Sequence, residues 1–207
     1  MIRVNQELLK FMSGFEPPET NGFASQHKFK PKKIILEQAA RIEFVFIIKS
    51  GIAKCYRLEE NGSQFIQEFF GEGEIFGEIE MFNNDESFSY IEALTDLTVY
   101  QISRKNFNKL LEENLKFNRL ILNALAAKIK YKAIRHSFHQ LNPIETNLLR
   151  LKEQFPDLLK MISKADIANY LGITERSLNR SLKLLKERKL IGWKKWLRNE
   201  KKQWIIL

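Results

Sequence analysis

Residues 163–193 constrain the fold of this chain most strongly, because two short helical patterns meet there at a single glycine. Ser163 precedes the first pattern and Thr174 precedes the second, and a hydroxyl at such a position accepts a hydrogen bond from a free N–H of the first helical turn. Gly172 suits the left-handed conformation that ends many helices, and we expect Ile173 to be buried in the turn. The segment therefore predicts a helix–turn–helix.

The second predicted helix carries apolar and polar residues on opposite faces. The apolar positions of the two helices follow helical spacing and are Ile167, Ala168, Leu171, Leu178, Leu182 and Leu185. The outer face of the second helix is basic and bears amide and hydroxyl groups, which suit the base edges and phosphates of a DNA major groove. The predicted DNA-binding residues are Thr174, Glu175, Arg176, Ser177, Asn179, Arg180 and Lys183.

Two basic segments after this helix pair favour DNA binding over a pair of core helices with a solvated charged face. Residues 193–198 and 201–206 have the aromatic and β-branched content of strands, and Asn199 with Glu200 suits a turn between them. A hairpin that follows a helix–turn–helix makes a winged helix. Its Lys and Arg side chains would lie beside the phosphates that flank the groove.

The net charge supports the same interpretation, because it is concentrated in the last third of the chain. Residues 141–207 hold 15 Lys and Arg against 7 Asp and Glu, whereas residues 1–140 hold 19 against 18. Such segregation is typical of a surface that neutralises DNA phosphates and releases counterions. A membrane-surface role would instead need an amphipathic helix with a large exposed apolar face, and the sequence pattern shows none.

Several other classes of protein are disfavoured by the sequence. No apolar run approaches the ~20 residues of a membrane span, and residues 1–11 lack the apolar core of a signal peptide, so we expect a cytoplasmic protein with no membrane partner. Cys55 is the single cysteine, which excludes an internal disulfide and an iron–sulfur cluster. His27, His136 and His139 show no metal-ligand spacing and no catalytic motif occurs, so we expect neither a metal site nor an enzyme.

The region 25–103 has the pattern of a small antiparallel β-barrel or jelly roll. Short runs of β-branched and aromatic residues lie at 34–36, 45–48, 52–56, 65–70 and 97–102. Turn signals separate them at 49–51, 60–62, 71–73 and 83–85. A barrel of this size encloses a small ligand or is filled by its own side chains, and the 16 Phe residues of the chain suit a filled barrel.

The longest helical pattern covers residues 104–139, with Ser103 as its expected cap and Pro143 just beyond its end. One apolar stripe along it consists of Phe117, Leu120, Ala124, Ala127, Tyr131, Ile134 and Phe138. A second stripe includes Leu111, Leu115, Leu122, Leu125 and Ile129. One stripe can pack on the barrel, and the alternating spacing of the first suits a two-stranded coiled coil. We therefore expect a homodimer; a helix enclosed between two domains of one chain is the alternative.

The order of a β-barrel, a long helix and a winged helix resembles the CRP/FNR family of bacterial transcription regulators. The resemblance is carried by Gly51, the turn at 60–62, the segments 73–78 and 167–180, and Leu190 with Ile191. Segment 73–78 is similar to the family's phosphate-binding cassette. The resemblance implies an α+β fold with a cyclic-nucleotide-binding-like β-barrel at 1–103, a dimerisation helix at 104–140 and a winged-helix domain at 141–207.

The resemblance also implies a homodimer that regulates transcription from a two-fold-symmetric site on double-stranded DNA. Arg180 falls on the family's guanine-contacting arginine, and a guanidinium can bond both acceptors of a guanine edge. The family's Arg-Glu pair is reversed here as Glu175-Arg176, so we expect an altered half-site. RNA polymerase is implied as a further partner, through exposed side chains of residues 51–72. A ligand-sensing module that signals to a protein partner is the alternative function.

The segment 73–78 leads into a candidate effector pocket that comprises Gly77, Glu78, Ser87 and Ser89. In the cyclic-nucleotide binders that this segment resembles, the glutamate holds the ribose and an arginine about ten residues on pairs with the phosphate. Ser87 or Phe88 stands at the place of that arginine here.

Acidic residues strengthen the difference from the cyclic-nucleotide binders. Asp85 and Glu86 are expected to put negative charge where the phosphate would sit, and an uncompensated anion in a partly buried pocket is strongly disfavoured. The long helix also lacks the Thr-Ser pair that meets adenine in those relatives. We therefore expect no cyclic-nucleotide cofactor and leave the effector unknown; a true cyclic-nucleotide-dependent regulator is the alternative.

Overall fold

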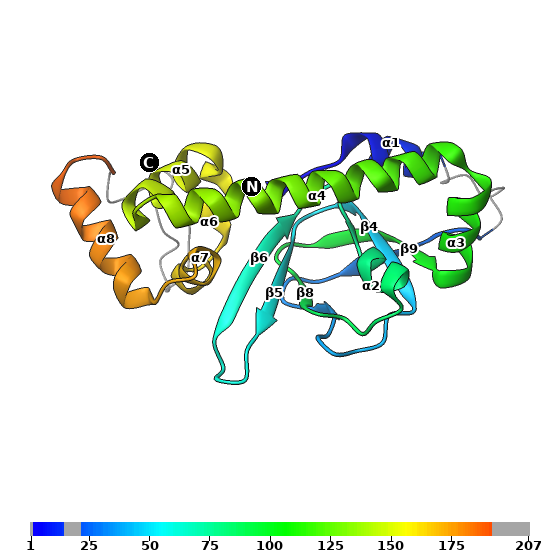
Figure 1. Cartoon of the computed structure of the whole chain (residues 1–207), viewed down its shortest axis with the longest axis horizontal. Helices are drawn as coiled ribbons and strands as arrows, with labels where there is room; N and C mark the ends of the chain where they lie inside the picture. Colours follow the sequence, from blue (N-terminus) through cyan, green and yellow to red (C-terminus); the bar gives the residue numbers. More distant parts are fainter. Residues whose placement is uncertain (1, 15–21, 192–207) are drawn as a thin grey trace. The chain divides into compact units, whose positions relative to one another are not determined.

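The computed structural model describes residues 2–14 and 22–191, and Figure 1 shows the course of the chain. The chain forms two compact units, Ile2–Tyr131 and the part from Lys132 onward, and their boundary falls inside one continuous helix. The bounds predicted for the three segments, 1–103, 104–140 and 141–207, stay predictions. The predicted hairpin at 193–206 lies outside the described residues.

The first unit is built on two β-sheets that enclose a shared apolar core. The five-stranded sheet has the order β1 (Ile2–Arg3), β6 (Gln64–Phe70), β5 (Ala53–Leu58), β8 (Tyr90–Ala93) and β3 (Ile34–Leu36). The four-stranded sheet has the order β2 (Ser25–Phe29), β9 (Leu97–Ser103), β4 (Phe44–Ser50) and β7 (Ile75–Phe76). Ile48 of β4, Ala53 of β5 and Val99 of β9 belong to one buried cluster, which confirms the predicted β-rich domain.

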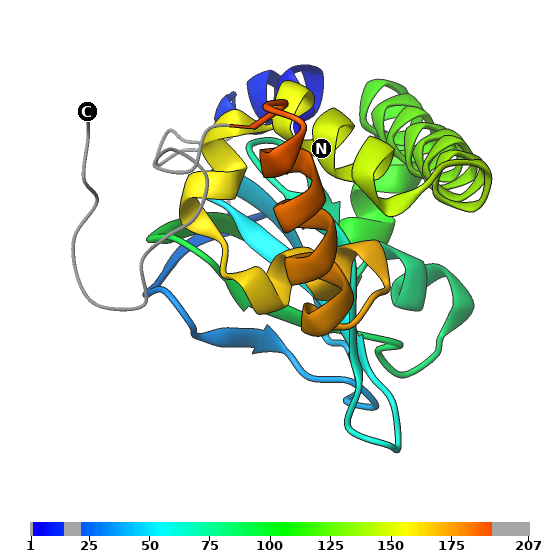
Figure 2. The same ribbon diagram turned by 90° about the vertical axis from the view of Figure 1, so that its left-hand side faces the viewer.

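The five predicted apolar runs are confirmed as β3, β4, β5, β6 and β9, and the structure adds β1, β2, β7 and β8 among the described residues. Among these, β1 pairs in parallel with β6, with Ile2 opposite Phe69, although the other described strand pairs are antiparallel. Two residues joined to a partner so far along the chain leave no periodic signal in the sequence. The hairpin of β5 and β6 extends away from the sheets in both views (Figures 1 and 2).

The prediction of a single helix over 104–139 is wrong in one respect. The structure has two helices there, α3 (Arg104–Glu113) and α4 (Leu115–Leu141). Ser103 caps α3 as predicted, by accepting a hydrogen bond from the N–H of Asn106 at 3.3 Å. Asn114 lies between the helices in an extended conformation, and its Oδ1 accepts from the N–H of Phe117 at 2.9 Å. The extended backbone of Asn114 thus ends α3, and its side-chain amide caps α4.

One face of α4 packs on the β-sheets through Phe117, Leu120 and Ala124. The prediction that this stripe forms the coiled-coil seam is therefore wrong, because the exposed stripe is the one through Leu115, Leu122 and Ile129. The short helix α1 (Gln6–Ser13) lies beside it in Figure 1, and Phe11 contacts Phe117 with ring centroids 5.5 Å apart. Ala127 and Ile134 of the predicted stripe are exposed rather than buried. The buried face of α4 instead continues through Ile121 and Lys128, in steps of four, three and four residues from Phe117.

The second unit contains four helices after the end of α4. They are α5 (Ile144–Gln154), α6 (Pro156–Met161), α7 (Lys164–Leu171) and α8 (Glu175–Glu187). Figure 2 shows these helices from a second direction, with α8 in orange to red. Its core includes Leu148 and Leu151 of α5, Ile167 of α7 and Leu178 of α8. Among the described residues, no helix combines the length and the apolar character that a membrane crossing requires.

Candidate nucleic-acid interface and effector pocket

The turn between α7 and α8 is held by side-chain caps at both helix starts. Ser163 accepts from the N–H of Asp166 at 3.0 Å, and the Asp166 carboxylate accepts in return from the N–H of Ser163 at 3.1 Å. Gly172 ends α7 in the left-handed region with φ of 66°. Thr174 then caps α8 by accepting from the N–H of Ser177 at 3.1 Å. The predicted helix–turn–helix is confirmed, with one difference: Ile173 is only half-buried.

The two faces of α8 are divided as the sequence predicts. Leu178, Leu182 and Leu185 are buried against the rest of the unit. The exposed side holds Thr174, Glu175, Arg176, Asn179, Arg180 and Lys183, while Ser177 is half-buried. The structure therefore brings the predicted DNA-binding residues to the accessible side and N-terminal turn of one 13-residue helix. A helix of this length can enter a major groove.

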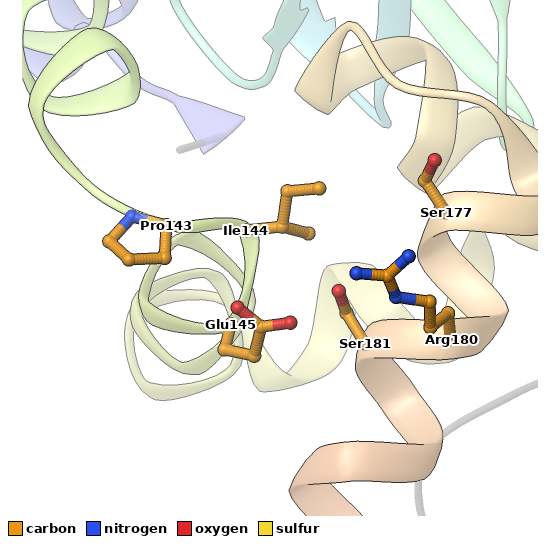
Figure 3. A pocket seen from close by; sticks show the side chains of 6 residues that line it. All are labelled: Pro143, Ile144, Glu145, Ser177, Arg180 and Ser181. Carbon is orange, nitrogen blue, oxygen red and sulfur yellow. The ribbon is translucent and has the colours of Figure 1, made fainter.

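A cleft of about 380 Å³ lies beside this face and reaches α5 (Figure 3). Sequence reasoning missed one of the residues that line it, Glu145, in the first turn of α5. A hydrogen bond from the Ser181 hydroxyl, a second from its own backbone N–H, and the positive charges of Arg188 and Arg180 lower the pKa of Glu145. A carboxylate thus stands, ionised, at the edge of the basic face.

The cassette predicted at 73–78 forms β7 and leads into α2 (Glu78–Asn83). Gly77 has φ of 86°, and a Cβ atom there would lie 2.8 Å from the carbonyl oxygen of Phe44, so a glycine is required. The carboxylate of Glu78 is buried, and its Oε1 lies 2.5 Å from the Nζ of Lys128 on α4. The same ammonium donates to the carbonyl oxygen of Ile75 at 2.6 Å.

A second buried ion pair lies next to the first. Arg3 of β1 donates to Glu74 Oε1 from Nε at 3.3 Å and from Nη2 at 3.2 Å, and its Nη1 is 3.7 Å from Glu68 Oε2. Burial raises the pKa of Glu74, while the positive charges of Arg3 and Lys128 act in the opposite direction. The chain thus places the buried carboxylates of Glu68, Glu74 and Glu78 in and beside the cassette, together with the cations of Arg3 and Lys128.

The predicted pocket hydroxyls are both buried and both have partners within the protein. Ser87 donates to the carbonyl oxygen of Ser89 at 2.8 Å and also contacts Glu80 Oε1 at 3.4 Å. The hydroxyl of Ser89 is 3.2 Å from the thiol of Cys55. Burial raises the pKa of Glu80 above its ordinary value, despite hydrogen bonds to its carboxylate.

The prediction that Asp85 and Glu86 place negative charge in the pocket is wrong. Both residues are exposed, because they follow the end of α2 on the surface. Of the acidic residues from the start of α2 to Glu86, the buried ones are instead Glu78 and Glu80. Sequence position alone could not distinguish these four acidic residues, which lie within nine positions of one another.

The histidines do not converge on a metal-binding arrangement in the part of the chain that the structure describes, where no group of three or more potential ligands occurs. His139 packs edge-on against Tyr170, with ring centroids 6.1 Å apart. Burial and the charges of Arg135 and Arg150 lower its pKa to about 4.

Two family models match the chain and follow its two units. The cyclic nucleotide-binding domain matches residues 26–114, and the Crp-like helix-turn-helix domain matches residues 146–201. The cAMP-activated global transcriptional regulator CRP of Salmonella typhimurium is 24% identical over 177 residues, which cover 80% of this chain and 84% of that protein. The nitrogen fixation regulation protein FixK of Rhizobium meliloti is 29% identical over 167 residues, covering 79% and 76%.

Solved structures show the same fold. The c-di-GMP-responsive global regulator CLP of Xanthomonas campestris has a TM-score of 0.74 at 14% identity, over 91% of this chain and 94% of that one. FixK2 of Bradyrhizobium japonicum has a TM-score of 0.67 at 21% identity, over 85% of this chain and 93% of that one. The likeness therefore extends over both units.

Proposed function

Because the chain is a member of the CRP/FNR family of DNA-binding transcription regulators, we propose that it binds a two-fold-symmetric operator as a homodimer. In this proposal, α8 of each protomer enters a major groove, and the two half-sites lie about one DNA turn apart. The observation that carries the proposal is the exposed basic side of α8, held by the Ser163 and Thr174 caps.

Arg180 is the residue we propose to read guanine. It is exposed on α8, and a bidentate contact to guanine contributes about 1–3 kcal/mol of discrimination. Arg180→Ala should therefore weaken binding to the specific site by about 5- to 150-fold and relax the preference at one base pair. Arg41→Ala, the same change at an exposed position of the first unit, serves as the control. Unchanged specific binding by Arg180→Ala would contradict the assignment.

Selection of bound fragments from genomic DNA by the purified protein tests the proposed function directly. We expect an enriched two-fold-symmetric motif, found equally with and without cyclic AMP. A motif that requires cyclic AMP would support the nucleotide-dependent alternative. If no motif is enriched under either condition, the operator proposal fails and the alternative of a protein partner is favoured.

The exposed side of α4 supports the proposed homodimer. The apolar side chains exposed there include Leu115 at 84%, Leu122 at 60% and Ile129 at 71%. These three recur every seven residues, which is the repeat of a coiled-coil seam. Leu122→Glu should convert a dimer to a monomer in sedimentation equilibrium and abolish binding to the paired half-sites. Asn123→Glu, at the neighbouring exposed position, should leave both unchanged. A wild-type monomer would overturn this part of the proposal.

We propose further that DNA binding requires no cyclic nucleotide. In the relatives that the cassette resembles, the glutamate at the position of Glu78 holds the ribose, whereas here its Oε1 already contacts the ammonium of Lys128. The proposal rests on this contact and on the serines near the cassette, which carry no charge for a phosphate. Calorimetric titration with cyclic AMP and with cyclic di-GMP should give no saturable binding. Binding of either with a Kd in the micromolar range would contradict it.

RNA polymerase is the further partner we propose, through the exposed hairpin of β5 and β6. Leu58 and Phe65 are 42% and 41% exposed there, beside the acidic Glu59 and Glu60. Phe65→Ala should lower transcription from a bound promoter in a reconstituted system without changing DNA affinity. Unaltered transcription by that variant would count against a polymerase contact at this hairpin.

A further inference from the structure

An acidic side chain lies beside the predicted base-reading arginine. Figure 3 shows the carboxylate of Glu145 on α5 turned toward the Ser181 hydroxyl and the Arg180 guanidinium on α8. The three groups line one cleft together with Pro143, Ile144 and Ser177. A carboxylate in this place is unexpected, because the neighbouring surface is proposed to approach DNA phosphates.

The groups around Glu145 are the kinds of group that hold phosphates in protein–DNA interfaces. Hydroxyls, backbone N–H groups at a helix start and arginines all serve this purpose. The buried Ser181 hydroxyl and the backbone N–H of Glu145 both donate to its carboxylate, and Arg180 and Arg188 act on it through their charge. Pro143 provides no side-chain cap for α5. The carboxylate of Glu145 is therefore the anion that lies at the first turn of this helix and accepts from a backbone N–H there.

We propose that Glu145 acts as an internal substitute for a DNA phosphate and thereby sets how well the protein distinguishes its operator from other DNA. The inference rests on the proposed function. On random DNA, the carboxylate repels the nearest phosphate and partly neutralises Arg180, so that arginine contributes little to binding. On the operator, Arg180 is engaged with guanine, and the carboxylate has less influence on it.

Removal of the charge should therefore strengthen non-specific binding more than specific binding. Glu145→Gln keeps the size of the side chain, and fluorescence anisotropy over a KCl series should show about tenfold tighter binding to a random-sequence duplex at low salt. The slope of log K against log[KCl] should steepen by about 0.9, which corresponds to one additional phosphate contact. Affinity for the selected motif should rise less than about threefold, so discrimination falls.

Two further variants separate this role from a structural one. Glu153→Gln makes the same charge change at an exposed position near the other end of α5 and should behave as wild type. Glu145→Asp keeps the negative charge and should preserve the wild-type salt slope. An unchanged salt slope in Glu145→Gln, or an equal change in Glu153→Gln, overturns the inference while leaving the proposed function intact. Failure of the wild type to prefer any motif overturns the proposed function and the inference with it.

Discussion

The buried pair of Lys128 and Glu78 provides a quantitative test of how the long helix is joined to the cassette. Only 6% of the Lys128 side chain and 1% of the Glu78 side chain are exposed. The second carboxylate oxygen, Oε2, accepts no hydrogen bond from the described residues. Removing one member of such a pair leaves a buried charge without compensation, which costs about 3–5 kcal/mol.

Lys128→Met keeps the aliphatic stem and removes the ammonium, so we expect the free energy of unfolding to fall by about 3–5 kcal/mol. Replacing both partners, as Lys128→Met with Glu78→Leu, should recover most of this loss, because apolar replacements of buried ion pairs are often neutral or stabilising. The difference between the double variant and the sum of the single variants gives the coupling energy.

Urea unfolding followed by far-UV circular dichroism is the suitable assay. Tryptophan fluorescence is unsuitable, because Trp193, Trp196 and Trp204 all lie in the last 15 residues of the chain and none lies in the first unit. Protomer concentration must be kept constant, since association shifts apparent stability. Lys130→Met, the same change at an exposed position two residues on, should alter stability by less than about 0.5 kcal/mol. A loss below about 1 kcal/mol in Lys128→Met would refute the burial argument.

Three other predictions concern local features. In urea unfolding, Gly73→Ala should destabilise the protein by more than about 2 kcal/mol. The cause is a φ of +76° and a new Cβ atom that would lie 1.9 Å from the carbonyl oxygen of Asn5. Gly62→Ala is the control, because Gly62 has a φ of +79° but open space around it, and this change should cost only about 1–2 kcal/mol. Thr174→Ala should lower the free energy of unfolding by about 1 kcal/mol, because it removes the cap of α8. Thr174→Val, which also lacks the hydroxyl, should lower it by the same amount. His139 has a pKa of about 4 in the folded state, below the ordinary 6.5, so wild-type stability should fall as pH decreases from about 6.5 to about 4. His139→Gln should flatten that dependence, and an unchanged pH profile would contradict it.

The elements with strong periodicity could be predicted from the sequence. Leu178, Leu182 and Leu185 recur on one side of α8, and the caps at Ser163 and Thr174 have local signatures, so the helix pair and its exposed basic side were predictable. Strands β3, β4, β5, β6 and β9 were also identified by their β-branched and aromatic runs. In each case the signal lies within about ten consecutive residues.

The features that depend on distant partners were not predictable. Asn114 divides α3 from α4 through a capping bond that a helical pattern does not reveal. Lys128 carries a charge that a helical pattern assigns to the solvent, and only the tertiary fold shows that its ammonium is buried against Glu78. The exposed Asp85 and the buried Glu80 differ in environment because α2 ends between them. Glu145 likewise acquires its surroundings from α8, 36 positions further along the chain at Ser181.

The separation along the chain between Glu78 and Lys128 has a consequence for synthesis of the protein. The two residues are 50 positions apart, and Arg3 is 71 positions from Glu74. At a ribosomal rate of about 5–20 residues per second, Lys128 is added roughly 2.5 to 10 s after Glu78. During that interval the cassette of each nascent chain has its carboxylate without its lysine, so the first unit reaches its final packing only after most of α4 has left the ribosome.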